Sequence, residues 1–297
     1  MPGQDLRYSE RPTLRKPIMI AAFDGWNDAA EAATSAIEHL QDSWDATPFA
    51  TIDPEEFYDF TEVRPTVRLV GENQRQIDWP TNEFFYYRDP DRDQDFILLL
   101  GVEPSLKWRR FTEAISEVAR EFNVASFISL GALLSDVPHG REARVTVNAT
   151  DPQLRERIGR VRPSRYEGPT GIVGILHEAL GKAGVPGANL WGHAPHYLSA
   201  SPNPMVTLGI LRRLSELLDL NLDLTEMEGE AATFVTQVNE AVSRDPEALS
   251  YIHQLETQTE DDDDDEEESE PMPRSPNNGK SLIEDVEDFL RRRHDKD

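Results

Sequence analysis

Charged and polar residues gather in one short stretch of the sequence, "SLGALLSDVPHGRE", which covers residues 129–142. It contains Asp136 and His139, the residue types of a general base and of the group that orients it. Ser135 stands beside them, but the stretch lacks the small-x-Ser-x-small turn that presents a hydrolase nucleophile. A polar surface loop has the same composition, so both interpretations stay open at this point.

A second segment, "FDGWNDAAE" (23–31), has Asp24, Gly25 and Asn27 between a buried run and a helical pattern. Free backbone N–H groups at a helix start can bind the anionic group of a ligand. The alternative is that the acidic side chains simply cap the helix. No glycine-rich phosphate loop of a known pattern is present in the sequence.

Two later segments carry glycine and histidine. "YEGPTGIVGILHEAL" (166–180) places Gly168, Thr170 and Gly171 at a helix start, where glycine permits close approach of a ligand or of another element. "WGHAPHYLSASPNP" (191–204) contains His196 and a second histidine three residues earlier. With no cysteine and no third clear ligand, we expect neither a metal site nor a cofactor.

Strand-like and helix-like patterns alternate along most of the chain. Residues 18–23 form a continuous apolar run, as in a parallel strand covered on both faces, and an Ala-rich helix follows. Residues 95–134 repeat the order strand, helix, strand, and 201–220 form a helix capped by Asn203. This alternation predicts an α/β fold, specifically a three-layer α/β/α sandwich.

In such a sheet, the carboxyl ends of parallel strands meet at one edge, where ligands bind. A strand over 127–130 is expected to end at Gly131. Four segments would therefore share one cleft. Its expected ligand-contacting residues are Asp24, Gly25, Asn27, Gly131, Asp136, His139, Gly168, Thr170, Gly171 and His196.

The composition divides the chain into four parts. An α/β core is expected over 1–215, with a β-hairpin insertion near 60–80 around the turn "VGEN". A helical lid follows at 216–256, where apolar residues have helical spacing and no strand pattern occurs. Residues 257–280 form an acidic, low-complexity linker that we expect to be disordered.

The final part, 281–294, is predicted to be an amphipathic tail helix. Ser281 and Glu284 form a capping box, and the acidic residues precede a run of arginines, which suits the helix dipole. Such a helix could dock on its own oligomer or on an outside partner. Its apolar stripe, the expected partner-binding set, consists of Leu282, Ile283, Val286, Phe289 and Leu290.

Charge and composition exclude several classes of function. The formal net charge is −26, and ten of the eleven residues from Glu260 to Glu270 are acidic. Nucleic-acid binding is not expected, because it requires a basic face. The sequence contains neither the apolar segment of a signal peptide nor a run of roughly 20 apolar residues that could span a membrane. A cytoplasmic protein without membrane attachment is expected.

The motifs "FDGWNDA", "SLGALLSDVPH", "YEGPTGIVGILH" and "PHYLSASPNPMVTLGIL", in this order, resemble the actinobacterial branch of the proteasome assembly chaperone family, related to its second subunit. The resemblance covers about residues 15–255. It implies a core like that of purine nucleoside phosphorylases, a β-hairpin used in oligomerisation, a C-terminal helical lid and homotrimers. Some relatives dock on proteasomes through a hydrophobic-Tyr-x tail, whereas this sequence ends "RRRHDKD".

Two functions therefore remain open. The first is a non-catalytic homo-oligomer, similar to proteasome assembly chaperones, that binds a protein or a ligand through the strand-end cleft. The alternative is a hydrolase or phosphorylase-like enzyme for a small metabolite, which would use Asp24, Asp136, His139 and His196 in the same cleft.

Overall fold

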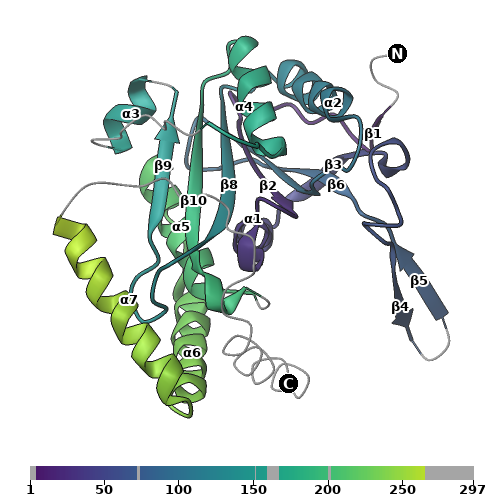
Figure 1. The fold of residues 1–297 in the computed structure, drawn as a ribbon. Coiled ribbons are helices and arrows are strands. Elements are labelled where there is room, and N and C mark those ends of the chain that lie inside the picture. The colour runs from purple at the N-terminus through teal and green to yellow at the C-terminus, as the bar shows by residue number, and fades with distance from the viewer. Residues whose placement is uncertain (1–4, 72–73, 151, 159–166, 200–201, 265–297) are drawn as a thin grey trace.

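The computed structural model describes residues 5–71, 74–150, 152–158, 167–199 and 202–264 (Figure 1). One large sheet of eight strands runs through it. In spatial order the strands are β1 (Leu6–Tyr8), β3 (Thr47–Ile52), β6 (Asn82–Tyr87), β7 (Phe96–Val102), β2 (Ile18–Asp24), β8 (Ser126–Ser135), β10 (Gly187–Pro195) and β9 (Val145–Ala149). The central four, β7, β2, β8 and β10, are mutually parallel, and the outer strands pair antiparallel.

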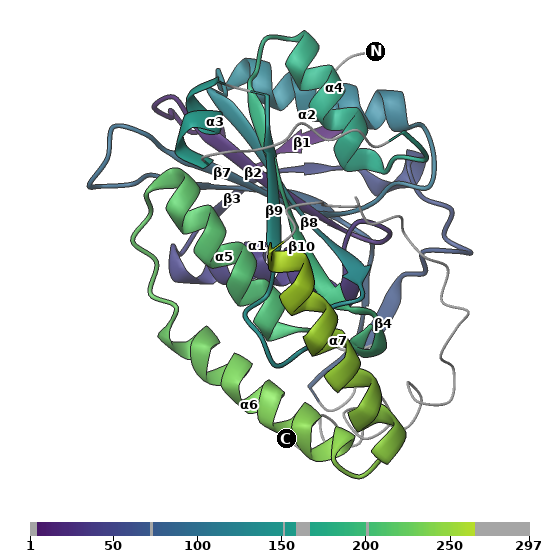
Figure 2. The ribbon, with the colours of Figure 1, turned by 60° about the vertical axis from the view of Figure 1, so that its left-hand side comes forward.

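Helices cover both faces of this sheet (Figure 2). Helices α1 (Ala32–Ser43) and α5 (Pro204–Leu218) pack on one face, and α2 (Trp108–Glu121) and α4 (Ile172–Lys182) pack on the other. Alternate residues of β2 enter the two cores, and only its last residue, Asp24, is exposed. Burial on both faces explains why the central strands are continuous apolar runs. The predicted three-layer α/β/α sandwich is confirmed.

Short elements join the layers: the 3-10 turns η1 (Ala29–Glu31), η2 (Pro54–Glu56) and η3 (His196–Leu198), and helix α3 (Pro152–Ile158). Helix α5 starts as the sequence predicts. The Asn203 side chain accepts hydrogen bonds from the backbone N–H groups of Met205 at 3.1 Å and Val206 at 3.3 Å, and Pro204 occupies the first turn.

Strand β8 differs from its predicted extent. It continues through Gly131 to Ser135, because parallel pairing with β10 extends as far as Ser135 opposite Pro195. Gly131 therefore lies inside the sheet, and the prediction that the strand ends there is wrong. A Cβ atom at this position would lie 2.7 Å from the ring of Trp191, so glycine serves the packing of two neighbouring strands.

The chain segment that connects β3 to β6 forms a separate two-stranded sheet, which projects from the core (Figure 1). It consists of β4 (Thr66–Val70) and β5 (Gln74–Asp78), which pair antiparallel with Val67 opposite Ile77. Nearly every described side chain in this hairpin is exposed.

The chain ends its described part in two long helices, α6 (Thr225–Val242) and α7 (Pro246–Asp264). Apolar residues of both pack on η3, where Tyr197 and Leu198 are buried. Helix α7 continues to Asp264, so the helical part extends beyond residue 256, where the sequence suggested that a linker begins. Residues 281–294, the predicted tail helix, lie outside the described residues. No helix of the described part is long and apolar enough to cross a membrane.

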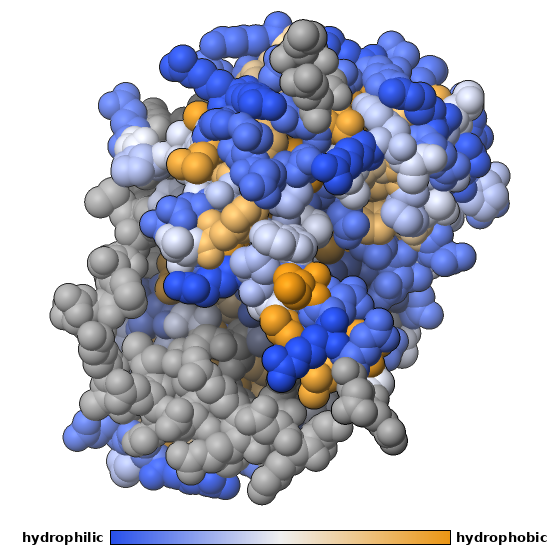
Figure 3. Space-filling model, turned by 90° about the vertical axis from the view of Figure 1, so that its right-hand side faces the viewer, coloured by the Kyte–Doolittle hydropathy of each residue, from blue (hydrophilic) through white to orange (hydrophobic). Residues whose placement is uncertain are grey.

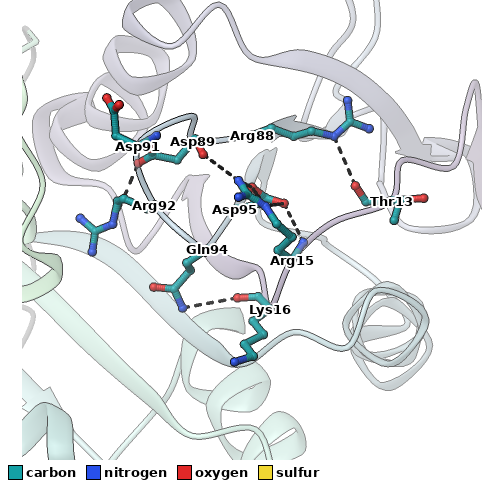
Figure 4. Close-up of polar contacts among 9 residues, drawn as sticks. All are labelled: Thr13, Arg15, Lys16, Arg88, Asp89, Asp91, Arg92, Gln94 and Asp95. Atoms are coloured by element: carbon teal, nitrogen blue, oxygen red, sulfur yellow. Dashed lines mark hydrogen bonds and ion pairs between the residues drawn. The ribbon is translucent and has the colours of Figure 1, made fainter.

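A buried carboxylate joins the segments that lead into β2 and β7 (Figure 4). Asp95, whose side chain is 1% exposed, accepts hydrogen bonds from the backbone N–H of Arg15 at 2.6 Å and from its guanidinium Nη2 at 2.6 Å. The backbone carbonyl of Asp95 also accepts the N–H of Ile18, the first residue of β2. The carboxylate thus fixes the start of two adjacent central strands.

We predict that Asp95→Ala lowers the free energy of unfolding by about 1–3 kcal/mol, because it leaves the Arg15 backbone N–H without its acceptor. Urea unfolding measures this loss. The control is Asp93→Ala, whose exposed side chain predicts a change within about 0.5 kcal/mol. Equal losses in the two variants would contradict a structural role for the Asp95 carboxylate.

Candidate functional site

The carboxyl ends of β2 and β7 lie side by side at one edge of the sheet. Asp24 ends β2, and its carbonyl accepts the backbone N–H of Glu103 at 2.8 Å. Gly25 follows with a φ of +125°, a conformation that favours glycine. A Cβ atom there would also lie 3.2 Å from the Cβ of Glu103. Both constraints require Gly25 where these two loops meet.

The Glu103 carboxylate occupies the amino-terminal end of α4. Its Oε1 accepts the side-chain N–H of Asn27 at 2.8 Å and the backbone N–H of Ile172, the first residue of α4, also at 2.8 Å. A Cβ atom on Gly171 would come within 2.3 Å of the Asn27 side-chain oxygen. Helix N-termini attract anions, and here the protein supplies its own.

Asp28 caps the first turn of helix α1. Its carboxylate accepts the backbone N–H of Ala33 at 2.6 Å, and it binds the hydroxyl of Thr34. Burial raises the pKa of Asp28 to about 6. The neighbouring carbonyl of Asn27 accepts the N–H of Ala132 in β8 at 2.8 Å, so this loop is fixed to the sheet on both sides.

Several groups at this edge remain open to solvent. The residues Asp24, Gly168 and Thr170 are exposed, and so are two large apolar residues, Trp26 at 50% and Leu106 at 48%. Trp26 follows β2 and Leu106 follows β7, so they extend from the two loops that meet at Gly25 and Glu103. We call Asp24, Trp26, Leu106, Gly168 and Thr170 the strand-end surface.

His139 lies in a different environment, beneath helix α6. Its Nε2 lies 3.1 Å from Oδ1 of Asn239 in α6, and its Nδ1 lies 2.9 Å from the Tyr197 hydroxyl. That arrangement fits a neutral imidazole with its proton on Nε2, which donates to the Asn239 oxygen. The ring is buried, with 4% of the residue exposed. Burial lowers the pKa of His139, while Asn239 and the nearby Glu256 carboxylate oppose that shift.

Asp136 and His196 meet beside it. The His196 Nδ1 lies 3.3 Å from Oδ1 of Asp136, and its Nε2 lies 3.3 Å from the Tyr251 hydroxyl in α7. Arg141 donates to the backbone carbonyl of Glu256, also in α7. These contacts attach both helices to the ends of β8 and β10. We call His139, His196, Tyr197, Asn239 and Tyr251 the lid anchor.

The structure therefore separates the predicted site residues. Asn27 and Gly171 belong to the Glu103 contact, Gly25 adjoins it, and Asp24, Gly168 and Thr170 are exposed nearby. His139 is buried beneath α6, His196 contacts Tyr251 of α7, and Asp136 is exposed beside His196. Sequence reasoning missed Glu103, although a carboxylate directly after the apolar run "FILLLGV" is the signal that could have found it.

Two further histidines, His177 in α4 and His193 in β10, contact serine hydroxyls of β8. The Ser129 hydroxyl lies 2.7 Å from Nε2 of His177, and burial lowers the His177 pKa to about 4, which keeps it neutral. The Ser135 hydroxyl lies 2.9 Å from Nδ1 of His193. The described residues contain no group of three or more His, Asp or Glu side chains that could hold a metal ion.

Comparison with known proteins identifies relatives. A model of the PAC2 family matches residues 22–242. A PAC2 family protein from Streptomyces avermitilis is 42% identical, with a TM-score of 0.72, over 79% of this chain and 99% of that one. A proteasome-assembly chaperone homologue from Mycobacterium tuberculosis is 38% identical, with a TM-score of 0.71 and the same coverage.

A Mycobacterium tuberculosis protein of unknown function superimposes more closely at lower identity. It is 26% identical, with a TM-score of 0.81, over 89% of this chain and 94% of that one. No protein with a curated description matches the chain.

The lid anchor generates a prediction about pH. A histidine in the unfolded chain has a pKa near 6.5, whereas the pKa of buried His139 is lower. Below about pH 6.5 the unfolded chain therefore binds more protons, and stability decreases as the pH falls. We expect the loss of unfolding free energy between about pH 7.5 and pH 5 to be larger in the unaltered chain than in His139→Gln.

Urea unfolding at a series of pH values measures this difference. His253→Gln is the matched control, because His253 lies exposed on α7. We expect its pH profile to match that of the unaltered chain. Identical profiles for His139→Gln and the unaltered chain would show that His139 does not couple the lid anchor to pH.

Proposed function

The chain belongs to the PAC2 family, and from this premise we propose that it is a non-catalytic, homo-oligomeric protein with a chaperone-like, partner-binding role. The name of its 38% identical relative, a proteasome-assembly chaperone homologue, supports a partner among proteasome subunits. In this proposal the chain holds a partner surface during assembly and converts no substrate. No cofactor or metal is required for such a role.

The observation that carries the non-catalytic proposal is the use of the charged and titratable groups at the sheet edge. A general base must reach the proton it removes. Both ring nitrogens of His139 already contact Tyr197 and Asn239 inside the protein. The Glu103 carboxylate holds the start of α4. His139 and Glu103 thus stabilise the fold through contacts within the protein. In an enzyme, a catalytic base or acid must be able to reach the substrate instead.

The same contacts argue against the alternative, a hydrolase or phosphorylase-like enzyme for a small metabolite. A phosphorylase needs an anion site, and helix N-termini commonly provide one. At α4 that position is taken by Glu103, whose negative charge would repel phosphate. Asp136 and His196 contact each other beside the ends of β8 and β10, and Asp24, the remaining residue of the enzymatic hypothesis, lies on a different element, at the end of β2.

Partner binding is proposed for the strand-end surface. An exposed tryptophan such as Trp26 is the kind of residue that dominates protein interfaces when a partner covers it, and Leu106 adds apolar area. Asp24, Gly168 and Thr170 add polar contacts around them. The tail segment 281–294 is a further proposed contact, either with the chain's own oligomer or with the partner.

Homo-oligomerisation is proposed for the β4–β5 hairpin, and a trimer is the expected size. Five apolar side chains of the hairpin region are exposed: Val67, Leu69, Val70, Ile77 and Trp79. Apolar surface of this kind in a monomer normally marks a contact. The resemblance of the sequence to trimeric chaperone-like proteins is consistent with this assignment.

We predict that Trp26→Ser combined with Leu106→Ser weakens capture of purified proteasome α-subunits at least about tenfold, because each side chain would lose more than about 1 kcal/mol of contact. Quantitative pull-down with full-length chain measures the effect. Leu249→Ser is the control, since Leu249 is similarly exposed, at 41%, on α7. The same captured amount for the double variant and the unaltered chain would contradict partner binding at the strand-end surface.

A further inference from the structure

A hollow of about 330 Å³ opens where α1 meets strands β6 and β7. Phe85 and Leu100 form its apolar part, and three carboxylates, Glu38, Asp42 and Glu83, surround them. No described residue forms a hydrogen bond or an ion pair with the side chains of these three acids. The hollow therefore combines apolar surface with negative charge that nothing in the described part of the chain compensates.

The hollow lies where the helical layer on this face of the sheet ends. Helices α1 and α5 pack on β2, β7, β8, β9 and β10, whereas β3 and β6 extend past α1 (Figure 1). The opposite face of β3 and β6 is sealed, because Phe49, Ile52 and Phe84 are buried there. On the α1 side, Thr51 and Glu83, which pair across these two strands, are only partly buried. The layer has room for one more helix.

A group that docks here needs a cation as well as apolar side chains. Figure 3 views the molecule from the side on which β1, β3 and the hairpin lie, and the described apolar residues form separate patches there among hydrophilic ones. Partial burial raises the pKa of Glu38, and the nearby carboxylates of Glu31 and Asp42 raise it further. A guanidinium group would relieve this repulsion, and arginine is well suited to carboxylate contacts.

The C-terminal segment of the sequence carries this combination of groups on one helical face. Arg293 follows Val286 by seven residues and Phe289 by four, so it continues the apolar stripe of the predicted tail helix. The stripe thus ends in a cation. The acidic residues of the segment fall outside the stripe: Glu284, Asp285, Glu287 and Asp288.

The connecting chain is long enough for this contact. Helix α7 ends on the β9 side of the sheet (Figure 1). In the sheet order β6 lies five steps from β9, which is about 24 Å at the usual strand spacing. Leu282 follows Asp264 by 18 positions. A peptide of that length spans about 27 Å as a helix and up to about 60 Å when extended.

We propose that the segment 281–294 docks as a helix in the hollow of its own chain. Its apolar stripe then covers Phe85 and Leu100, and Arg293 lies among the three carboxylates. The docked helix completes the α1 layer over β3 and β6. This inference rests on the proposed tail contact and specifies its receptor, a surface separate from the strand-end surface.

Hydrogen exchange of the full-length chain, measured by mass spectrometry, tests this docking. An isolated helix of 14 residues is marginal in water, so the tail amides resist exchange only when the helix is docked. We expect Arg293→Glu, and separately Glu38→Arg combined with Asp42→Arg, to speed tail exchange at least about tenfold, because each loses charge-assisted hydrogen bonds. Combining all three substitutions should restore most of the protection, since the charges are then exchanged across the contact.

Each side of the contact has a matched control. Arg291→Glu changes a charge of the tail that lies away from the apolar stripe. Glu230→Arg changes an exposed charge on α6. Both should leave tail exchange within about twofold of the unaltered chain. Unchanged protection of β2 and β8 in the same data shows that each variant keeps the fold.

The possible outcomes separate this inference from the proposed partner-binding function. A tail that exchanges freely in the unaltered chain, or a triple variant without rescue, overturns the inference and leaves partner binding at the strand-end surface standing. Protection that disappears on about twentyfold dilution assigns the tail to a second copy and overturns docking within one chain. Protection that appears only after addition of purified proteasome α-subunits assigns the tail to the partner, which overturns it as well.

Discussion

The Glu103 carboxylate is the contact on which the strand-end edge depends. One oxygen of this carboxylate accepts hydrogen bonds from the Asn27 side chain and from the first backbone N–H of α4. It thereby joins the loops after β2 and β7 to a helix that begins 69 residues later in the sequence. The approach is close enough that Gly25 and Gly171 leave no room for a Cβ atom without a shift of Glu103 or Asn27. An internal anion at a helix N-terminus stabilises the edge and removes the place where an anionic substrate would bind.

At the ends of β8 and β10, side chains are buried beneath two helices. β8 and β10 extend beyond β2, and their ends are covered by α6 and α7 through the lid anchor. Burial lowers the pKa of His139 there, because it disfavours the charged form of the ring. His139 and His196, which are residue types common in catalysis, here contact Asn239 of α6 and Tyr251 of α7. The exposed surface includes large apolar side chains: Trp26 and Leu106 at the edge, and others in the hairpin. That distribution suits a protein that binds other proteins.

Local patterns in the sequence predicted much of the fold. Asn203 before Pro204 fixes a helix start through bonds within three residues, and the apolar run of β2 indicates a buried parallel strand. Contacts between distant residues could not be predicted in this way. Glu103 lies 69 positions from Ile172, and His139 lies 100 positions from Asn239. Gly131 was misassigned because glycine commonly ends strands, whereas here pairing with β10 and the ring of Trp191 decide its place.

The central claim is that Glu103 occupies the anion position of α4, so that the edge is structural. The backbone N–H of Ile172 reports on it directly. In an NMR titration of the full-length chain with inorganic phosphate at about 1 mM, a site with even about −4 kcal/mol of binding energy would be half filled. The account predicts that the Ile172 amide signal does not move. A saturable shift of that signal would contradict it and return the strand-end edge to the class of ligand-binding or catalytic sites.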